Sequence, residues 1–289
     1  MWRLHRPAPF LIIEVVERML ARLVMDAVLV DSHAHLGDAQ LAGDLAGVLA
    51  RASAAGVAAV VDVGADVASS RLAVATASRW PAVWATVGVH PHDAAGADDA
   101  AFAELRRLAA EPRVVAIGEC GLDYFRDLSP RDVQRRVFAR QLALARELGL
   151  PAVIHCRSAQ AEGSDAYAEC LDVVAAELGC PARGVLHCFQ GDGAVARRAL
   201  GLGLRIGIGG SLTFPREEAL RRTVAELPLE RLLLETDCPY LTPRPKRGRN
   251  EAAYVRHTAE CLAALLRLPL GRVAEATTAG ARELFAIAP

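Results

Sequence analysis

Eight short apolar segments recur along the 289 residues of this chain, and a longer stretch of helical or loop character follows each of them. Their apolar runs are nearly continuous, which is typical of parallel strands buried on both faces. We expect strands at residues 27–31, 57–63, 83–89, 114–118, 151–155, 184–187, 204–208 and 231–236. Eight strand–helix units favour a closed (β/α)8 barrel of the TIM type over an open sheet, and a barrel of about 250 residues fits the length.

The segments between these strands show helical patterns, most clearly over residues 130–149. Ser129 is a suitable N-cap, Pro130 fits the first helical position and Gly149 ends the apolar face. The other expected helices span residues 41–55, 97–110, 165–179, 193–202, 215–226, 250–266 and 271–285. No linker interrupts this series, so we expect a single α/β domain over residues 27–289.

Residues 1–26 precede the first expected strand and contain no apolar run of the length that a signal peptide or a membrane span needs. Our hypothesis is that they form an N-terminal extension outside the native fold, with Met25 close to the natural start. The seven cysteines are odd in number and include no C-x-x-C pair. That usage favours a reducing cytoplasm over a secreted disulfide scaffold.

Side chains of the kind that bind metal ions stand at the ends of the expected strands. His33 and His35 follow the first strand, and residues two apart in an extended segment point to the same side. Other strand ends carry His90, His92, Glu119, His155, His187 and Asp237. One such residue alone is more often a polar group where a strand meets solvent. The carboxyl ends of barrel strands meet at one face, however, so this set is expected to converge there.

Imidazole and carboxylate groups are common ligands of zinc and related divalent ions. Four histidines and two carboxylates exceed what one tetrahedral ion with an open position uses. We therefore predict two divalent ions per subunit, with Mg²⁺, Mn²⁺ and Zn²⁺ all open as candidates. Glu119, on a middle strand, is the candidate bridge between them, and Asp237 is expected both to bind an ion and to accept a proton from the attacking water.

Longer motifs surround these residues. They are DSHAHL (31–36), GVHPH (88–92), AIGECGLDY (116–124), VIHCR (153–157), HCF (187–189), LETDCPYL (234–241), RNE (249–251) and ARELF (281–285). Together they resemble the TatD family of metal-dependent deoxyribonucleases, within the amidohydrolase-like barrels. The likeness covers roughly residues 27–286, in order and at the usual spacing.

The resemblance implies a metal-dependent hydrolase that cleaves DNA phosphodiester bonds, and we predict an exonuclease. It implies that one ion is held by His33, His35, Glu119 and Asp237, and the other by Glu119, His155 and His187. One departure is Ala252, where the family usually has a proline after the Arg-Asn-Glu segment, and it concerns the shape of that loop.

Basic and aromatic residues near the strand ends are candidates for substrate contact. The net charge of −1 gives no support for nucleic-acid binding by the chain as a whole, but it does not exclude a local basic patch. The predicted substrate contacts are His90, His92, Tyr124, Arg126, Arg157, Arg247 and Arg249. For Arg247 and Arg249 the rival interpretation is a solvated basic loop, and for Arg157 it is an ion pair with a carboxylate. For Tyr124 and Arg126 it is loop packing. His90 and His92 could instead support the metal ligands.

A hydrolase of a small ester or amide, or of an aminoacyl-RNA ester, is the main alternative, because barrels of this kind host many chemistries. A carboxylated lysine often bridges two metals in such relatives, but the only lysine, Lys246, lies in a loop. This favours a glutamate bridge and DNA as the substrate. A third hypothesis, a barrel that only binds nucleic acid or a partner, is disfavoured by the complete ligand set. We expect no membrane association and no obligate protein partner.

Overall fold

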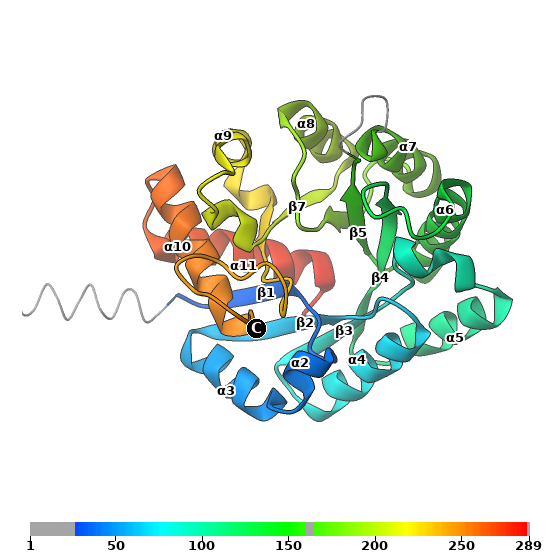
Figure 1. Cartoon of the computed structure of the whole chain (residues 1–289), viewed down its shortest axis with the longest axis horizontal. Helices are drawn as coiled ribbons and strands as arrows, with labels where there is room; N and C mark the ends of the chain where they lie inside the picture. The colour runs from blue at the N-terminus through cyan, green and yellow to red at the C-terminus, as the bar shows by residue number, and fades with distance from the viewer. Residues whose placement is uncertain (1–26, 160–164, 288–289) are drawn as a thin grey trace, which may run out of the picture.

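The computed structural model describes residues 27–159 and 165–287, so the predicted N-terminal extension lies outside the described residues. Within them, eight strands form one parallel sheet with helices around its outside (Figure 1). The strands are β1 (Leu29–Ala34), β2 (Val57–Val63), β3 (Val83–Val87), β4 (Val114–Asp123), β5 (Ala152–Arg157), β6 (Gly184–Leu186), β7 (Arg205–Ile208) and β8 (Leu232–Leu234).

Each strand pairs with the next one along the chain, in the order β1 to β8. The barrel closes where the end of β1 meets the segment after β8. There the amide of His35 donates to the carbonyl of Cys238 at 2.8 Å, and the amide of Asp237 donates to the carbonyl of His33 at 2.9 Å. We call these two contacts the seam. The predicted TIM-type (β/α)8 barrel is therefore confirmed.

Helices connect the strands, and in the described part of the chain none is both long and apolar enough to cross a membrane. The α-helices are α2 (Ala39–Ala42), α3 (Leu45–Ala54), α4 (Val67–Arg79), α5 (Asp99–Ala109), α6 (Arg131–Leu148), α7 (Ala166–Leu178), α8 (Gly193–Leu202), α9 (Glu218–Ala225), α10 (Val255–Leu266) and α11 (Leu270–Phe285). Short 3₁₀ helices are η1 (Pro91–Gly96), η2 (Gly210–Thr213), η3 (Leu229–Arg231) and η4 (Ala252–Tyr254).

Helix α4 is absent from the sequence-based expectations. Its buried face consists of the small residues Ser70, Ala73 and Ala77, so the contrast between its apolar and polar faces is weak. The signal that marks it is a capping box, in which the Asp66 carboxylate accepts from the Ser69 amide while the Ser69 hydroxyl accepts from the Asp66 amide.

Two other helix predictions are wrong in detail. The stretch 41–55 is interrupted between α2 and α3, and the helix expected from residue 130 begins at Arg131 with Pro130 as its N-cap. The hydroxyl of Ser129, expected to cap this helix, instead donates to the carbonyl of His92 at 2.8 Å. Ser129 also accepts from the amide of Ala95 at 3.1 Å, so it ties η1 to the start of α6.

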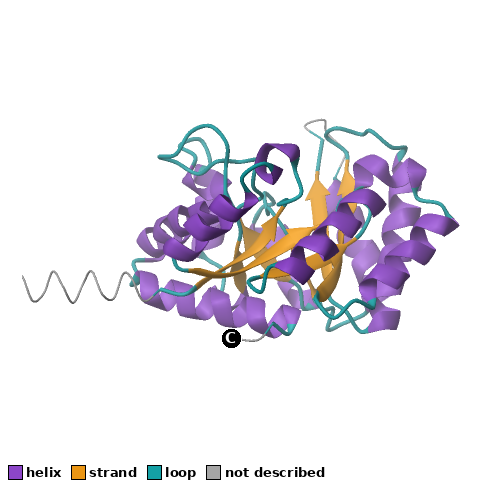
Figure 2. Cartoon of the chain, turned by 90° about the horizontal axis from the view of Figure 1, so that it is seen from below, coloured by secondary structure: helices purple, strands orange, loops and turns teal. Residues whose placement is uncertain are grey.

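A separate apolar cluster lies inside the barrel. It includes Val30, Val61, Val63, Val115, Val153, Val185, Leu233, Leu284 and Phe285. The last two belong to α11, which lies at the amino ends of the strands, because Thr278 on this helix donates to the carbonyl of Val28 at 2.9 Å. The strands run among the surrounding helices, away from α11 and towards the loops at their carboxyl ends (Figure 2). With one end of the barrel closed by α11, the carboxyl end is left for the site.

Candidate metal centre

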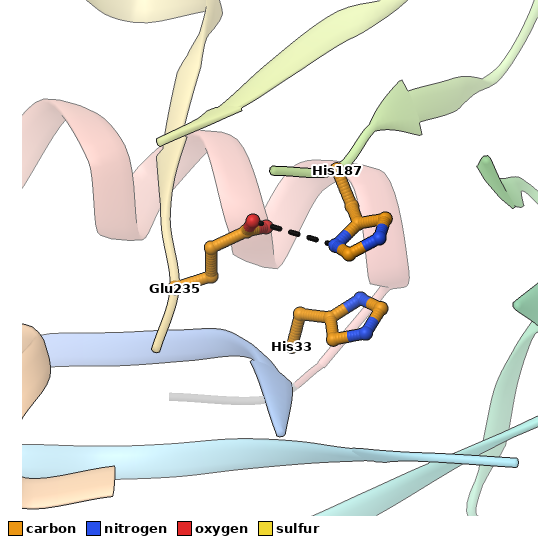
Figure 3. A group of neighbouring side chains, drawn as sticks. All are labelled: His33, His187 and Glu235. Atoms are coloured by element: carbon orange, nitrogen blue, oxygen red, sulfur yellow. Dashed lines mark ion pairs between the residues drawn. The ribbon is translucent and has the colours of Figure 1, made fainter. Parts of the chain in front are cut away.

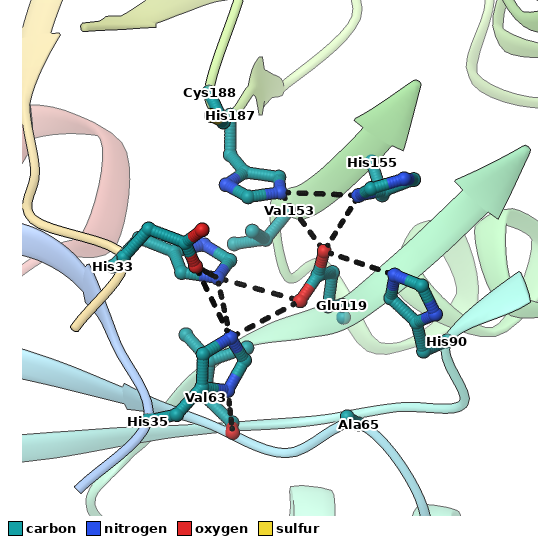
Figure 4. Close-up of polar contacts among 12 residues, drawn as sticks. His33, His35, Val63, Ala65, His90, Glu119, Val153, His155, His187 and Cys188 are labelled. Carbon is teal, nitrogen blue, oxygen red and sulfur yellow. Dashed lines mark hydrogen bonds and ion pairs between the residues drawn. The ribbon is translucent and has the colours of Figure 1, made fainter. Parts of the chain in front are cut away.

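All six predicted metal ligands come together at the carboxyl end of the barrel, around the carboxylate on β4. Figure 4 shows five of them, and Asp237 joins them through its contacts with His33 and His35. Three belong to strands, because β1 and β4 run further than the sequence pattern indicates. Those within strands are His33, Glu119 and His155, and those just beyond strands are His35, His187 and Asp237. Residues from five strands or strand ends therefore meet at one point, as the barrel topology requires.

One oxygen of the Glu119 carboxylate faces the imidazoles of β5 and of the β6 end. Glu119 Oε1 lies 2.9 Å from His155 Nδ1, 2.8 Å from His187 Nε2 and 3.5 Å from His90 Nε2. The first two ring nitrogens are 3.3 Å apart. Glu119 Oε1, His155 Nδ1 and His187 Nε2 form the first ligand set.

The other oxygen of the same carboxylate faces the seam. Glu119 Oε2 lies 3.4 Å from His33 Nε2 and 3.6 Å from His35 Nε2. Asp237 Oδ1 completes this second ligand set, at 3.7 Å from His33 Nε2 and 3.3 Å from His35 Nε2. One buried carboxylate thus has one oxygen in each of two ligand sets.

These distances fit metal ions as the common partner of the facing atoms. Ligands at about 2.0–2.1 Å from a tetrahedral ion lie about 3.3 Å from one another. The ring nitrogens of His33 and His35 are separated by 3.3 Å, as are those of His155 and His187. Two facing imidazole lone pairs at this distance are unfavourable unless a proton or a cation lies between them. The imidazole nitrogens suit zinc and related transition ions, and the carboxylate oxygens suit manganese and magnesium as well.

Neighbouring groups orient the histidines through their far nitrogens. Nδ1 of His35 lies 3.2 Å from the carbonyl of Val63, which leaves Nε2 free to face the second set. Nε2 of His155 lies 3.0 Å from Asp123 Oδ2, which leaves Nδ1 free to face the first set. A carboxylate or carbonyl behind a ligating imidazole fixes its tautomer and raises its basicity.

Glu235 lies behind His187 in a similar position, at a longer distance than a hydrogen bond (Figure 3). Nδ1 of His187 lies 3.5 Å from Glu235 Oε1, and the ring of His187 stacks on that of His33 with centroids 3.8 Å apart. Both Glu235 and His33 are fully buried. Although His33, His187 and Glu235 are close enough to hold an ion by themselves, Nε2 of His187 faces Glu119. We therefore assign Glu235 to the orientation of His187.

The ionisable side chains at the centre strongly shift one another's pKa values. Burial raises the pKa of Glu119, but the imidazoles of His187, His90 and His33 lower it well below its usual range overall. Burial lowers the pKa of His187, yet the carboxylates of Glu119 and Glu235 raise it well above its usual value. A cation that binds here must displace protons from these nitrogens, so binding weakens as the pH falls.

A cleft of about 630 Å³ opens above the two ligand sets. Among the predicted substrate contacts, His90, His92, Arg126 and Arg157 line it. The guanidinium of Arg157 stacks on the ring of Phe125 at 3.8 Å from its centroid. The expected alternative, an ion pair of Arg157 with a carboxylate, is not found in the described part of the chain. His92 makes a 3.0 Å contact through Nε2 to Asp123 Oδ2.

Three predicted substrate contacts lie elsewhere. Tyr124 is buried, and its hydroxyl donates to Glu169 at 2.7 Å, so it does not line the cleft. Arg249 donates to the carbonyl of Gln40 at 2.7 Å and does not line the cleft. Arg247 lines a second cavity beside the cleft. Loop packing, the rival interpretation for Tyr124, describes that residue better. Arg249, for which the rival was a solvated basic loop, instead donates a hydrogen bond to the backbone.

Comparison with known proteins gives a consistent result. The profile of the family described as TatD related DNase matches residues 30–286. The chain belongs to this family. It is 40% identical over 260 residues to a protein from Bacillus subtilis named as an uncharacterized metal-dependent hydrolase, covering 90% of this chain and 99% of that one. It is 38% identical over 267 residues to the 3'-5' ssDNA/RNA exonuclease TatD of Edwardsiella piscicida, covering 90% of this chain and 100% of that one.

The TatD fold is also seen in solved structures. A TatD homologue from Escherichia coli superposes with a TM-score of 0.84 at 29% identity, covering 91% of this chain and 100% of that chain. Family, fold and the class of metal-dependent hydrolase are thus confirmed as predicted.

Asp123 and Glu235 are the functional residues that sequence reasoning missed in this TatD-related site. Both stand inside motifs that were identified, GECGLDY and LETDCPYL, but neither had a role assigned. Their signal is an acidic residue two or four positions from a ligand, at the same carboxyl end. That signal does not distinguish a metal ligand from a residue that holds one.

Proposed function

We propose that this chain is a metal-dependent nuclease that hydrolyses DNA phosphodiester bonds at a centre of two divalent ions. The observation that carries the proposal is the Glu119 carboxylate, with one oxygen in each ligand set. In the proposed assignment, Glu119 belongs to both sites. His33, His35 and Asp237 complete one, and His155 and His187 complete the other. When bound, such ions stabilise the charge on a phosphodiester and make water a better nucleophile.

The side chains around the ions have distinct tasks in this proposal. Asp237, whose Oδ1 is 3.3 Å from His35 Nε2 and which lines the cleft, accepts the proton of the attacking water. Burial raises the pKa of Asp237, but the hydrogen bond from His35 and the charge of His33 lower it overall, which keeps the carboxylate ionised and able to act as a base. Asp123 and Glu235 hold two imidazoles in place.

Substrate contacts are assigned to the cationic and imidazole groups of the cleft. Arg126 and Arg157 have no carboxylate partner in the described residues and can bind the non-bridging oxygens of a phosphate. His90 lies 3.5 Å from Glu119 Oε1 and is positioned to contact either a phosphate or the ion beside it. Tyr124 and Arg249 are left out of this assignment, because their polar groups already have partners.

The proposed substrate is single-stranded DNA, degraded from the 3' end in the cytoplasm. The names of several relatives, 38–44% identical, describe 3'-5' ssDNA/RNA exonucleases, and this supports both the strand state and the direction. Glu119 occupies the bridging position that a carboxylated lysine takes in many ester and amide hydrolases of this barrel type. This favours the nuclease over those alternatives.

The test uses single-stranded DNA labelled at either end, double-stranded DNA, RNA and a set of small esters. Each is incubated with Mg²⁺, Mn²⁺, Zn²⁺ or chelator, and wild type is compared with Asp237→Asn. We expect stepwise loss of nucleotides from the 3' end of single-stranded DNA, abolished by chelator and reduced by about 10²-fold or more in the variant. Cleavage of an ester while DNA survives in every metal would refute the proposal. DNA binding without any hydrolysis would instead indicate a binding protein.

A further inference from the structure

A second cavity, of about 730 Å³, lies beside the metal cleft. Its cations are Arg216, before α9, and Arg244, Lys246 and Arg247, in the loop after β8. We call it the basic cavity. The loop that forms it also forms the edge of the cleft. Tyr240 and Leu241 line the cleft, while residues from Thr242 onwards line the basic cavity.

The walls of the basic cavity are fixed by hydrogen bonds to backbone groups. The amide of Arg244 donates to the hydroxyl of Thr213 on η2 at 2.7 Å, and the hydroxyl of Thr242 donates to the carbonyl of Gly248 at 2.5 Å. On the other wall, Arg221 of α9 donates to the carbonyl of Phe214 at 2.6 Å. The loop is therefore held in one arrangement before any ligand binds, which reduces the entropy cost of binding.

Charge in the basic cavity is not balanced. Four cations face a single lining carboxylate, Glu217, and within residues 27–159 and 165–287 none of the four forms an ion pair. On α5 and α11, by contrast, the exposed arginines Arg106 and Arg272 pair with nearby glutamates. Cations without a carboxylate partner that share a concave surface produce a positive potential that attracts anions. Lys246 Nζ in addition lies 5.2 Å from the centroid of the Tyr254 ring, a neutral partner that leaves its charge unbalanced.

Aromatic side chains accompany these cations. Tyr240 is 49% exposed at the rim of the metal cleft, and Phe214 lines the basic cavity. Cations spaced along a groove together with exposed aromatic rings are the combination that binds unpaired nucleotides, through phosphate contacts and base stacking. A small ester has no group that would use such an extended surface.

We propose that the basic cavity binds backbone phosphates of a single-stranded polynucleotide whose scissile bond lies at the metal centre. The inference rests on the proposed function and extends it, because it assigns the preferred substrate as a strand of several nucleotides. The strand runs from the cleft past Tyr240 into the cavity, where Arg216, Arg244, Lys246 and Arg247 contact its phosphates.

The first experiment uses the single lysine as a probe. Because Lys246 is the only lysine of the chain, amine-selective methylation followed by peptide mass spectrometry reports on this cavity and, separately, on the N-terminal amine. Asp237→Asn protein is labelled with and without a single-stranded oligonucleotide of about a dozen nucleotides. We expect the oligonucleotide to slow methylation of Lys246 by about tenfold and to leave the N-terminal amine unchanged. An unchanged rate at Lys246, while fluorescence anisotropy shows the oligonucleotide bound, would overturn the inference.

The second experiment compares two variants with the same loss of charge. One replaces Arg216, Arg244, Lys246 and Arg247 with alanine. The control replaces Arg106, Arg136, Arg198 and Arg272, which lie on α5, α6, α8 and α11 and pair with carboxylates. Circular dichroism melting checks that both fold. We expect KM for the oligonucleotide to rise about tenfold or more in the first variant alone, with kcat within about twofold and a shallower dependence on salt.

A dinucleotide substrate separates this inference from the proposed function. It is too short to span both sites, so both variants should cleave it as wild type does. Equal KM values for the oligonucleotide in wild type and in the cavity variant would overturn the inference and leave the nuclease intact. Failure of wild type to cleave either substrate would instead refute the proposed function, while the methylation result still reports whether the cavity binds a polynucleotide.

Discussion

Among single residues, Glu119 faces both ligand sets, and its substitution is the most direct test of a shared centre. Glutamine keeps the shape of the side chain but removes the charge and places an amide near imidazole nitrogens. We expect Glu119→Gln to lower the metal retained after gel filtration by about tenfold or more, measured by inductively coupled plasma mass spectrometry. Glu169→Gln, at a carboxylate that contacts Tyr124 outside the cleft, is the matched control. Wild-type occupancy in Glu119→Gln would remove the bridge from the proposal.

Asp123 and Glu235 contact the proposed ligands His155 and His187 and not the ions themselves. Their substitution should therefore weaken metal binding without abolishing it. We expect Asp123→Asn and Glu235→Gln each to reduce metal affinity by about 10–100-fold, measured by competition with a fluorescent chelator. Excess metal should restore the occupancy of both variants. Affinity unchanged from wild type would mean that His155 and His187 are held by packing alone.

The buried carboxyl group of Asp62 should make the stability of the fold depend on pH. Burial raises its pKa to about 7, although the amide of Leu36 donates to Oδ1 at 2.8 Å and lowers it in part. Oδ2 is buried without a partner. Because the folded pKa exceeds the unfolded value, folding keeps this group protonated. Its contribution to stability is therefore complete below about pH 4 and is lost as the pH rises towards 7.

We therefore expect Asp62→Asn to gain unfolding free energy relative to wild type between pH 4 and 7, by roughly 1 kcal/mol per pH unit. Urea denaturation in chelator, at several pH values, measures this difference without a contribution from metal. A constant difference between the two proteins across that range would show that Asp62 is ionised in the fold.

At the level of elements, the centre depends on how closely β4 and β5 approach each other. Gly121 on β4 has φ +143°, and a Cβ there would lie 1.9 Å from the carbonyl oxygen of His155. Only glycine allows the two backbones this contact. Gly121 lies opposite His155 in the sheet, and the close approach of the two strands accompanies the 2.9 Å contact between His155 Nδ1 and Glu119 Oε1.

Substitution of Gly121 tests that approach. We expect Gly121→Ala to lower the free energy of unfolding by about 2–5 kcal/mol, from backbone strain and from overpacking, as measured by chemical denaturation. Gly271→Ala on α11 is the control, since nothing lies within 4 Å of a Cβ there and alanine favours the helix. Equal stability of Gly121→Ala and wild type would show that the strands separate at little cost.

At the level of the whole molecule, the second ligand set lies across the seam that closes the barrel. His33 and His35 come from β1 and its end, whereas Asp237 comes from beyond β8. Two backbone hydrogen bonds and the Asp31 carboxylate, which accepts from the hydroxyl of Thr236 at 2.6 Å, join the two sides. An ion bound by all three ligands would cross-link the barrel at this point.

Metal removal should consequently loosen the barrel at the seam first. We expect chelator to lower the melting temperature, since only the folded chain presents the ligands together. Hydrogen exchange should accelerate at the amides of His35 and Asp237 and stay nearly constant where β2 pairs with β3. Exchange that accelerates equally in all strands would indicate that the ions stabilise the molecule without acting on the seam.

Much of this protein is determined by its sequence alone. Runs of apolar residues that end in His, Glu or Asp require buried parallel strands with polar ends, and a barrel brings the carboxyl ends of all strands to one face. The ligand types and their collection at one end therefore follow without coordinates. The period of two residues in a strand also places His33 and His35 on the same side.

Only the tertiary structure decides which atoms face one another. The register and depth of neighbouring strands place Asp123 behind His155 and Glu235 behind His187, and sequence spacing says nothing of either. The path of one loop sends Arg247 into a cavity while Arg249 binds Gln40, although both are arginines in the same basic run. Local periodicity records which side of an element a residue occupies. The partner across the fold is set by packing between segments that are far apart in the chain.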